Sequence, residues 1–287
     1  MRPRIVQHFI LTRFNLLLWT KDKAGNKVRS KKWLKHRFAL FEKYCLLSIV
    51  NQTCKDFEWI VLFDNTTPEQ FKERIKNLHA KCPQMTPVFV EPAEGRYFAQ
   101  IFRNEVVKRL PEIQEFRGRV LTTYLDNDDA LDRHFVEDIQ RRSVTLEEGT
   151  FICYDDGYQF FTDYQYMMRV HFPRNHFMSV VEERNLATLK TIYGYGSHYY
   201  IDKIEGVKIE RIKDQPMWCE VVHEKNMGND AYLLNAKMVK AADGFSFMFQ
   251  DSGLRYGLGI YFFRFLPRYV KTFVRRVKIK LRGYRFE

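Results

Sequence analysis

The chain has 287 residues, of which 45% are hydrophobic and 16% aromatic, so it has enough apolar material for a sizeable core, and extensive disorder is excluded. Its formal net charge of +12 is concentrated at the end, because residues 258–287 hold nine Lys/Arg and one acid, a net +8, which leaves only +4 for the rest. The five scattered cysteines form no C-x-x-C pair, which argues against a disulfide framework or a zinc ribbon. No signal peptide and no apolar run of about 18 residues is found, so we expect a cytoplasmic protein.

The first half alternates strand-like and helix-like patterns, as βαβ units do. Strands are expected over 5–11, 59–63, 87–90 and 120–125. Helices are expected over 33–50, 68–80 and 96–110 and again from about 132, with a lysine-rich loop over 21–31. Thr67 and Pro68 supply a cap residue and a proline for the first turn of the second helix. After residue 150, aromatic β-prone runs separated by Asp/Gly turns predict a mixed second half, and no linker divides the two. We therefore expect one α/β domain over 1–257 with a Rossmann-like mixed sheet.

The stretch "TTYLDNDDAL", residues 122–131, places several carboxylates at the end of a predicted strand. A loop after the strand can turn Asp126 and Asp128 toward one point, where their charges repel each other. A divalent cation such as Mg²⁺ or Mn²⁺ relieves this repulsion, and it commonly takes one or two carboxylates together with substrate phosphates. The carboxyl end of a strand in an open α/β sheet is also where ligands bind.

The same residues have simpler interpretations. A solvated Asp/Asn turn followed by a helix cap at Asp129 or Asp132 explains the pattern without any ligand. A calcium loop starting at Asp126 is excluded, because Ala130 and Leu131 stand where a ligand and a glycine are required. A phosphatase-type nucleophile would need a lysine and further carboxylates that the sequence does not place.

Five stretches in this order carry a family resemblance: "HFILTRFN" (8–15), "RFALFEKYCLLSIVNQTCKDFEWIVLFDNTTP" (37–68), "TTYLDNDDAL" (122–131), "FMSVVEE" (177–183) and "PMWCEVVHEKN" (216–226). With them the chain resembles the GT-A glycosyltransferases, most closely the group of putative rhamnosyltransferases. One departure is Tyr124, where that group is expected to have arginine. The resemblance implies a GT-A-like fold, with residues 1–150 as the nucleotide-binding half and 151–257 as the acceptor and catalytic half.

The resemblance also implies roles for individual residues. Thr12, Arg13 and Asp64 are similar to positions that hold the base and ribose of a nucleotide-sugar donor. Asp126 and Asp128 match the D-x-D that binds Mn²⁺ or Mg²⁺ and the donor diphosphate, with Asp129 near the donor sugar. Without the resemblance, Asp64 is equally a turn residue before Asn65, and Arg13 equally a surface residue.

An inverting transfer needs a base for the acceptor hydroxyl. We expect Glu182 in this role, because its apolar neighbours in "FMSVVEE" would partly desolvate the carboxylate and raise its pKa. Asp156, with Asp155, is the competing candidate. The alternatives are a solvated glutamate pair at 182–183 and an Asp-Gly hairpin turn at 156–157.

Two histidines are further candidates. His223 follows a strand-like run, and its imidazole would supply a third metal ligand beside Asp126 and Asp128. The resemblance places His198 near the acceptor or the diphosphate. Either histidine is otherwise a packed or hydrogen-bonded residue. The rings of Tyr195, Tyr199 and Trp218 are candidates for stacking on sugars.

From Leu266 onward, apolar residues recur at helical spacing with Lys/Arg between them, which predicts a basic amphipathic helix in the tail, 258–287. Such a helix lies on an anionic membrane surface or docks its apolar stripe on the body. The tail lacks a nucleic-acid-binding motif, so we expect no nucleic-acid partner.

The first hypothesis is therefore a metal-dependent glycosyltransferase that moves a sugar, with rhamnose as a candidate, from a nucleotide-sugar donor to a glycan or lipid-linked acceptor. We expect it at the inner face of the cell membrane. The second is a non-catalytic module of the same fold that binds membrane surfaces or polyanions. Binding of Mn²⁺ and a nucleoside diphosphate separates the two.

Overall fold

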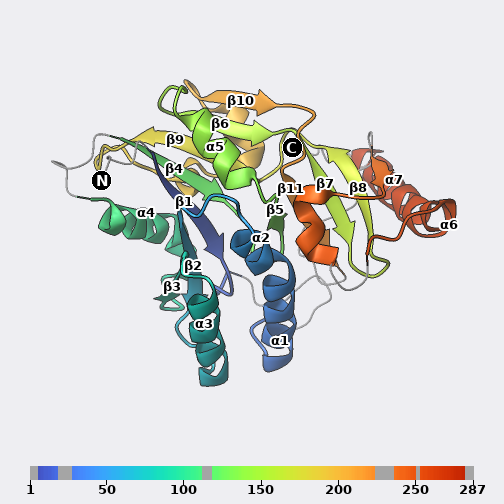
Figure 1. The fold of residues 1–287 in the computed structure, drawn as a ribbon, viewed down its shortest axis with the longest axis horizontal. Helices are drawn as coiled ribbons and strands as arrows, with labels where there is room; N and C mark the ends of the chain where they lie inside the picture. The colour runs from blue at the N-terminus through green and yellow to red at the C-terminus, as the bar shows by residue number, and fades with distance from the viewer. Residues whose placement is uncertain (1–5, 19–27, 112–117, 224–235, 250–252, 282–287) are drawn as a thin grey trace.

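The structure is a computed structural model that describes residues 6–18, 28–111, 118–223, 236–249 and 253–281. A seven-stranded sheet lies at its centre, with the strand order β10-β6-β9-β4-β1-β2-β3 (Figure 1). Its strands are β1 (Val6–Arg13), β2 (Glu58–Asp64), β3 (Met85–Val90), β4 (Arg119–Tyr124), β6 (Thr150–Tyr154), β9 (Met178–Glu183) and β10 (Lys208–Ile212). Strands β1 to β4 pair in parallel, whereas β9 runs antiparallel to both β4 and β6.

The direction of β9 decides which residues reach the carboxyl end of the parallel strands. Thr123, near the end of β4, pairs with Ser179 at the start of β9, whereas Val120 pairs with Glu182. The residues just before β9 therefore lie beside the end of β4. The end of β9 lies at the opposite edge of the sheet.

Apolar side chains alternate between the two faces of the sheet, as expected for strands buried on both sides. In β2, Trp59, Val61 and Phe63 enter one core cluster, and Ile60 and Leu62 enter another. The first cluster is covered by α1 (Lys31–Leu40), α3 (Glu69–Lys81) and α5 (Phe135–Ser143), and the second by α4 (Phe98–Arg109). Short 3₁₀ helices at Gly95–Tyr97, Ile192–Tyr195 and His198–Lys203 lie on the α4 side or in its loops.

A second sheet of five strands has the order β12-β8-β7-β11-β5. Its strands are β5 (Ala130–Leu131), β7 (Asp156–Phe161), β8 (Tyr166–His171), β11 (Trp218–Val222) and β12 (Lys237–Val239). Strand β5 follows the acidic stretch directly and pairs antiparallel with β11, so that Ala130 faces Cys219. The short connection between β4 and β5 therefore lies where the two sheets meet.

The expected elements are present with small shifts in their ends. The helix expected over 33–50 begins at Lys31 and contains a π-helical turn, Phe41–Leu46, before α2 (Leu47–Val50). The predicted cap at Thr67 is wrong: Pro68 takes the N-cap position of α3, and the Thr67 hydroxyl donates to the Asp64 carbonyl at 2.6 Å. Most of the loop expected over 21–31 lies outside the described residues.

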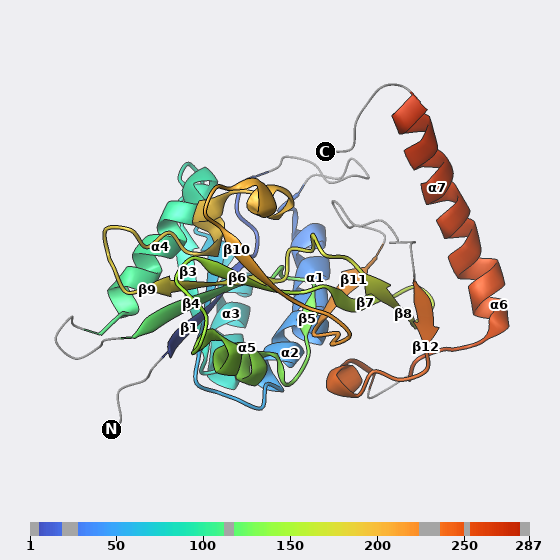
Figure 2. The ribbon, with the colours of Figure 1, turned by 90° about the horizontal axis from the view of Figure 1, so that it is seen from above.

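The mixed sheet and a helical C-terminal segment confirm the expected fold class. A 3₁₀ helix, Asp243–Phe249, packs beside β7 and β11, and the last elements are α6 (Leu258–Ile260), a π-helical turn (Tyr261–Phe265) and α7 (Leu266–Leu281). Both views place α6 and α7 at the end of the molecule beyond β8 (Figures 1 and 2). No helix in the described part of the chain has the length and hydropathy that crossing a membrane requires.

Candidate functional site

The acidic loop after β4 is fastened to the loop after β1. The Asn127 side-chain amide donates to the carbonyl of Arg13 at 2.7 Å and to that of Phe14 at 3.2 Å. Asp128 and Asp129 are buried, whereas the Asp126 side chain keeps 34% of its exposure. The stretch is therefore not a solvated turn. The carboxylates of Asp128 and Asp129 are held inside the protein, where burial without compensation costs several kcal/mol per charge.

Asp128 has two cationic or hydrogen-bonding partners from distant parts of the chain. One of its oxygens, Oδ2, lies 2.7 Å from an Arg37 guanidinium nitrogen and 2.9 Å from Nε2 of His223. Although burial opposes ionisation, these two partners hold the pKa of Asp128 below its ordinary value. His223, which we expected as a third metal ligand, thus lies beside Asp128, and Arg37 on α1 is a partner that we did not predict.

The remaining two aspartates form a group with His176. One ligand atom from each of Asp126, Asp129 and His176 lies within 4.8 Å of the others, a spacing that suits a metal ion. The His176 Nε2 lies 3.0 Å from Asp129 and 3.8 Å from Asp126. Burial lowers the pKa of His176, but the hydrogen bond to Asp129 and the charge of Asp126 outweigh it and raise that pKa to about 9.

Glu220 adds a fourth carboxylate to the same region. It is 1% exposed, and its Oε2 accepts a hydrogen bond of 2.5 Å from the Gln159 amide. At the next residue of β11, the Val221 N–H donates a hydrogen bond of 2.8 Å to Asp129, so β11 lies directly against the acidic loop. Burial and the charge of Asp129 raise the pKa of Glu220 to about 8. The donor set of carboxylates and imidazoles fits a divalent cation of the Mg²⁺ or Mn²⁺ type.

Arg13 reaches this group through Tyr124. The Arg13 guanidinium donates to the Tyr124 hydroxyl at 2.8 Å, and that hydroxyl donates to Asp126 at 2.9 Å. The guanidinium carbon also lies 4.6 Å from the ring centre of Phe98 and 5.1 Å from that of Tyr193, within the range of cation–π attraction. Tyr124, the residue that departs from the family pattern, thus connects a cation to the first aspartate of the D-x-D.

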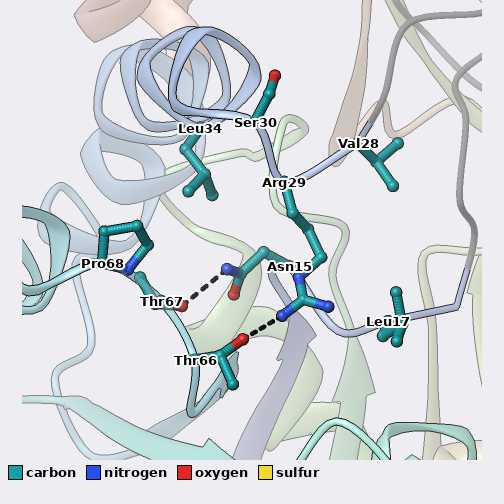
Figure 3. A pocket seen from close by; sticks show the side chains of 9 residues that line it. All are labelled: Asn15, Leu17, Val28, Arg29, Ser30, Leu34, Thr66, Thr67 and Pro68. Atoms are coloured by element: carbon teal, nitrogen blue, oxygen red, sulfur yellow. Dashed lines mark hydrogen bonds between the residues drawn. The ribbon is translucent and has the colours of Figure 1, made fainter.

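A cavity of about 370 Å³, called here the loop pocket, lies between the loop after β1 and the start of α1 (Figure 3). Figure 3 shows Asn15 bonded to Thr67 and Arg29 bonded to Thr66 on its wall. Asp64 is 1% exposed and lies behind this wall: its Oδ1 accepts from the Thr66 amide at 2.8 Å and pairs with Arg29 at 2.5 Å. Its Oδ2 is buried and has no hydrogen-bond partner among the described residues.

A second cavity, the histidine pocket, has a volume of about 320 Å³. Arg13, Tyr124, His176, Tyr193 and His198 contribute to its lining. The ring of His198 lies 5.7 Å from that of His176. Burial and the charges of His176 and Arg13 lower the pKa of His198 to about 3, so this imidazole is neutral.

Three predicted residues lie away from the acidic loop. Glu182 lies at the far end of β9, opposite Val120, roughly 13 Å from Tyr124 along β4. Its carboxylate accepts the amides of Lys190 at 2.8 Å and Thr191 at 3.0 Å. Thr191 has a φ of +64°, which is costly for a β-branched residue, so we assign Glu182 to holding this turn.

Asp156 and Thr12 also have structural partners. Asp156 lies at the start of β7, where it accepts from Nδ1 of His171 at 2.9 Å and from the Asp214 amide at 2.6 Å. Its neighbour Asp155 pairs with Arg211 at 2.9 Å. The Thr12 hydroxyl is buried and accepts from the Trp59 indole at 2.9 Å. The structure does not bring these side chains to the acidic loop.

The three rings proposed for sugar stacking are likewise separated. Trp218 is fully buried and stacks on Phe177, with ring centres 4.9 Å apart. Tyr195 packs on Phe151 and bonds to Glu182, whereas Tyr199 is half-exposed and lies against His198. Of the three, Tyr199 is the one that contacts a residue of the histidine pocket.

Three site residues were missed: Arg37, His176 and Glu220. Arg37 lies within the helical pattern of α1, and Glu220 within a strand-like run, so periodicity alone marks neither. His176 precedes β9 in a stretch without a motif. Only the antiparallel pairing of β9 with β4 brings His176 to the acidic loop, and the direction of a strand cannot be read from the sequence.

Comparison with known proteins identifies a family for this chain. Residues 7–233 match the model of a family described as putative rhamnosyl transferase. The chain belongs to this family, as the resemblance implied. No curated protein matches it.

Solved structures of TarS from S. aureus are similar at low identity. TarS 1–349 has 10% sequence identity and a TM-score of 0.42, and its complex with UDP has 10% identity and a TM-score of 0.44. Each alignment covers 75% of this chain and 60% of that chain. The chain thus spans about three fifths of the length of the TarS chains it matches.

Proposed function

We propose that this glycosyltransferase moves a sugar, with rhamnose as the first candidate, from a nucleoside-diphosphate sugar to a glycan or lipid-linked acceptor, with inversion and with the help of Mn²⁺ or Mg²⁺. The observation that carries the proposal is the group of Asp126 with the buried Asp128, Asp129 and Glu220, which arginines and histidines compensate and two cavities flank. Burial of so many carboxylates is costly unless a ligand uses them.

The chain's own residues would contact the nucleoside and the diphosphate of the donor. The loop pocket has room for a nucleoside, and the unpartnered Oδ2 of Asp64 would accept a hydrogen bond from it once the wall opens. Arg13 and Arg37, which lie near Asp126 and Asp128 of the acidic loop, would face the diphosphate and stabilise the charge that builds up on it as the leaving group. The family description is the support for rhamnose.

The divalent ion would be held by Asp126, Asp128 and Asp129, with His176 and His223 as the imidazoles within reach. When bound, it would neutralise charge on the departing diphosphate. The protein's own residues hold these carboxylates in place beforehand, because Asn127 fastens the loop and Val221 fixes Asp129.

The proton of the acceptor hydroxyl needs a base other than Glu182 or Asp156, since both lie away from this region. We propose His198, which lines the histidine pocket and is neutral. An anionic donor beside Arg13 would offset part of the positive charge that lowers its pKa, and so would make the imidazole a better proton acceptor. A lipid-linked acceptor would place the reaction at the inner face of the cell membrane, which the basic C-terminal segment supports.

Thermal unfolding with nucleoside diphosphates, with and without Mn²⁺, tests the proposal. A nucleotide at a hundredfold excess over its Kd adds about 2.7 kcal/mol to the stability of the folded state, and we expect this only with Mn²⁺ present. Asp128→Asn should abolish the stabilisation and reduce donor hydrolysis by about a hundredfold or more. Asp214→Asn, whose side chain is 93% exposed, is the control. Equal responses of both variants, or no response of the wild type, would favour the non-catalytic module.

A further inference from the structure

The C-terminal helical segment, residues 256–281, touches the body through a small part of its surface. Phe265 is 3% exposed, and the Arg264 guanidinium lies 4.2 Å from the ring centre of Tyr164. Arg268 pairs with Asp163 on the loop before β8. These contacts come from the π-helical turn and the first turn of α7. In Figure 2, the rest of α7 extends along the margin of the molecule beyond β12.

The face of this segment that points away from the body is apolar and exposed. Eight of the seventeen exposed large hydrophobic side chains among the described residues lie between Tyr256 and Val277. The most exposed are Leu258 at 76% and Phe263 at 78%. In α7 the apolar positions are spaced three and four residues apart, at 270, 273, 274 and 277, so they form one stripe along the helix.

Such a stripe is unusual on the surface of a monomer and indicates an interaction site. Its charge indicates the partner, because residues 258–287 hold nine Lys/Arg and one acid. A second copy of the chain would bring two segments of net charge +8 together. An anionic lipid surface instead accepts both features, since the apolar stripe enters the acyl boundary and the cations lie among the headgroups.

We infer that the C-terminal helical segment is a membrane-binding element that lies flat on an anionic lipid surface, with Leu258, Phe263, Phe273 and Val274 inserted. The biological role of this element rests on the proposed function, because membrane binding would bring the site to a lipid-linked acceptor. Its physical basis is independent of the reaction. The contacts of Phe265 and Arg268 with the body would hold the body close to the lipid surface on which the segment lies.

Flotation of the full-length protein with vesicles tests the inference. We expect binding to vesicles of phosphatidylcholine that contain phosphatidylglycerol, and at least about tenfold weaker binding to phosphatidylcholine alone. The variant Phe263→Ser with Val274→Ser should bind the anionic vesicles at least about tenfold more weakly, because two inserted side chains are lost. Lys271→Gln should reduce binding to anionic vesicles by about fivefold.

The matched control replaces exposed side chains of the body. Tyr97→Ser with Val144→Ser removes an exposed aromatic and a valine exposed to 44%, close to the 42% of Val274, and should leave vesicle binding unchanged. Equal loss in both double variants would overturn the inference. So would absence of binding to anionic vesicles combined with binding to a fluorescent DNA duplex, or dimerisation in sedimentation velocity that Phe263→Ser abolishes.

The thermal-unfolding assay with nucleotide distinguishes a failure of membrane binding from a failure of the proposed function. The Phe263→Ser and Val274→Ser variant should keep the stabilisation by nucleoside diphosphate and Mn²⁺, because neither residue lies at the acidic loop. Loss of vesicle binding with retained nucleotide binding supports the membrane-binding element. Vesicle binding without any nucleotide response would uphold the element and contradict the transferase proposal.

Discussion

Arg37 and Asp128 are 91 positions apart in the sequence, and their side chains form an ion pair of 2.7 Å in the interior. The side chains keep 13% and 10% of their exposure. Arg37 lies one turn after Leu34, which lines the loop pocket, so a single helix contacts both the proposed nucleoside cavity and the acidic loop. In the metal-free protein this arginine compensates part of the charge that a divalent ion would otherwise neutralise.

Replacement of Arg37 tests this compensation. Arg37→Met keeps the aliphatic stem and removes the charge, so Asp128 loses its cation and retains the hydrogen bond with His223. We expect the metal-free protein to lose about 3 kcal/mol of stability, and Mn²⁺ to restore much of it. Thermal unfolding with chelator and with Mn²⁺ measures both. Arg74→Met, in a more exposed pair with Glu42, should cost at most about 1 kcal/mol and show no such restoration by the metal.

Tyr124 should matter for turnover more than for stability. Tyr124→Phe keeps the ring and removes the hydroxyl that joins Arg13 to Asp126, so we expect about a tenfold loss of donor hydrolysis and a stability loss of about 1 kcal/mol. Tyr154→Phe is the matched control, because its hydroxyl donates to Asp138 away from the site. If both variants kept full turnover, Tyr124 would be a packing residue.

Glu220 should make the metal-free protein less stable as the pH rises. Its pKa is about 8 in the folded chain against an ordinary value of 4.5, so the folded state holds this proton more tightly. The resulting stability is fully present below about pH 4.5 and is lost as the pH rises through 8. The stability difference between Glu220→Gln and the wild type should therefore grow in favour of the variant over this range.

Glu105 is a control for this prediction, because its pKa is shifted in the opposite direction. Lys108 and Arg109 lower the pKa of Glu105 despite partial burial, so its contribution is lost as the pH falls. Glu105→Gln should accordingly match the wild type more closely at acid pH than at neutral pH. Chemical denaturation in chelator at a series of pH values measures both variants, and parallel curves for Glu220→Gln and the wild type would contradict the assignment.

Gly157 should be intolerant of any side chain. A Cβ at this position would lie 2.1 Å from the Trp218 indole, which cannot move away, because it is stacked on Phe177 and donates to the Tyr154 carbonyl at 2.8 Å. We expect Gly157→Ala to cost about 3 kcal/mol, measured as a shift in the urea midpoint. Gly259→Ala, with nothing within 4 Å of the added carbon, should cost nothing. A tolerated Gly157→Ala would mean that the indole has room to shift.

Helices and strands were predictable from the sequence where the spacing of apolar residues within the segment determines them. The strand expected over 59–63 is Glu58–Asp64, and the helix expected over 68–80 is Glu69–Lys81. Asp128 and His223 were placed together through family resemblance, and their 2.9 Å contact agrees with that. The role of Glu182 was misjudged for a long-range reason: the apolar run "FMSVV" predicts a strand, but the direction of that strand decides whether its start or its end meets β4. Residue periodicity is the same in both directions.

The antiparallel course of β9 has a consequence for how the protein matures. The three aspartates after β4 are synthesised early, but His176 and His223 come 47 and 95 positions later than Asp129 and Asp128, which they contact. A nascent chain that ends before His176 would carry the acidic loop without either histidine. We therefore expect this group of side chains to be complete only when both sheets have closed on each other, late in folding.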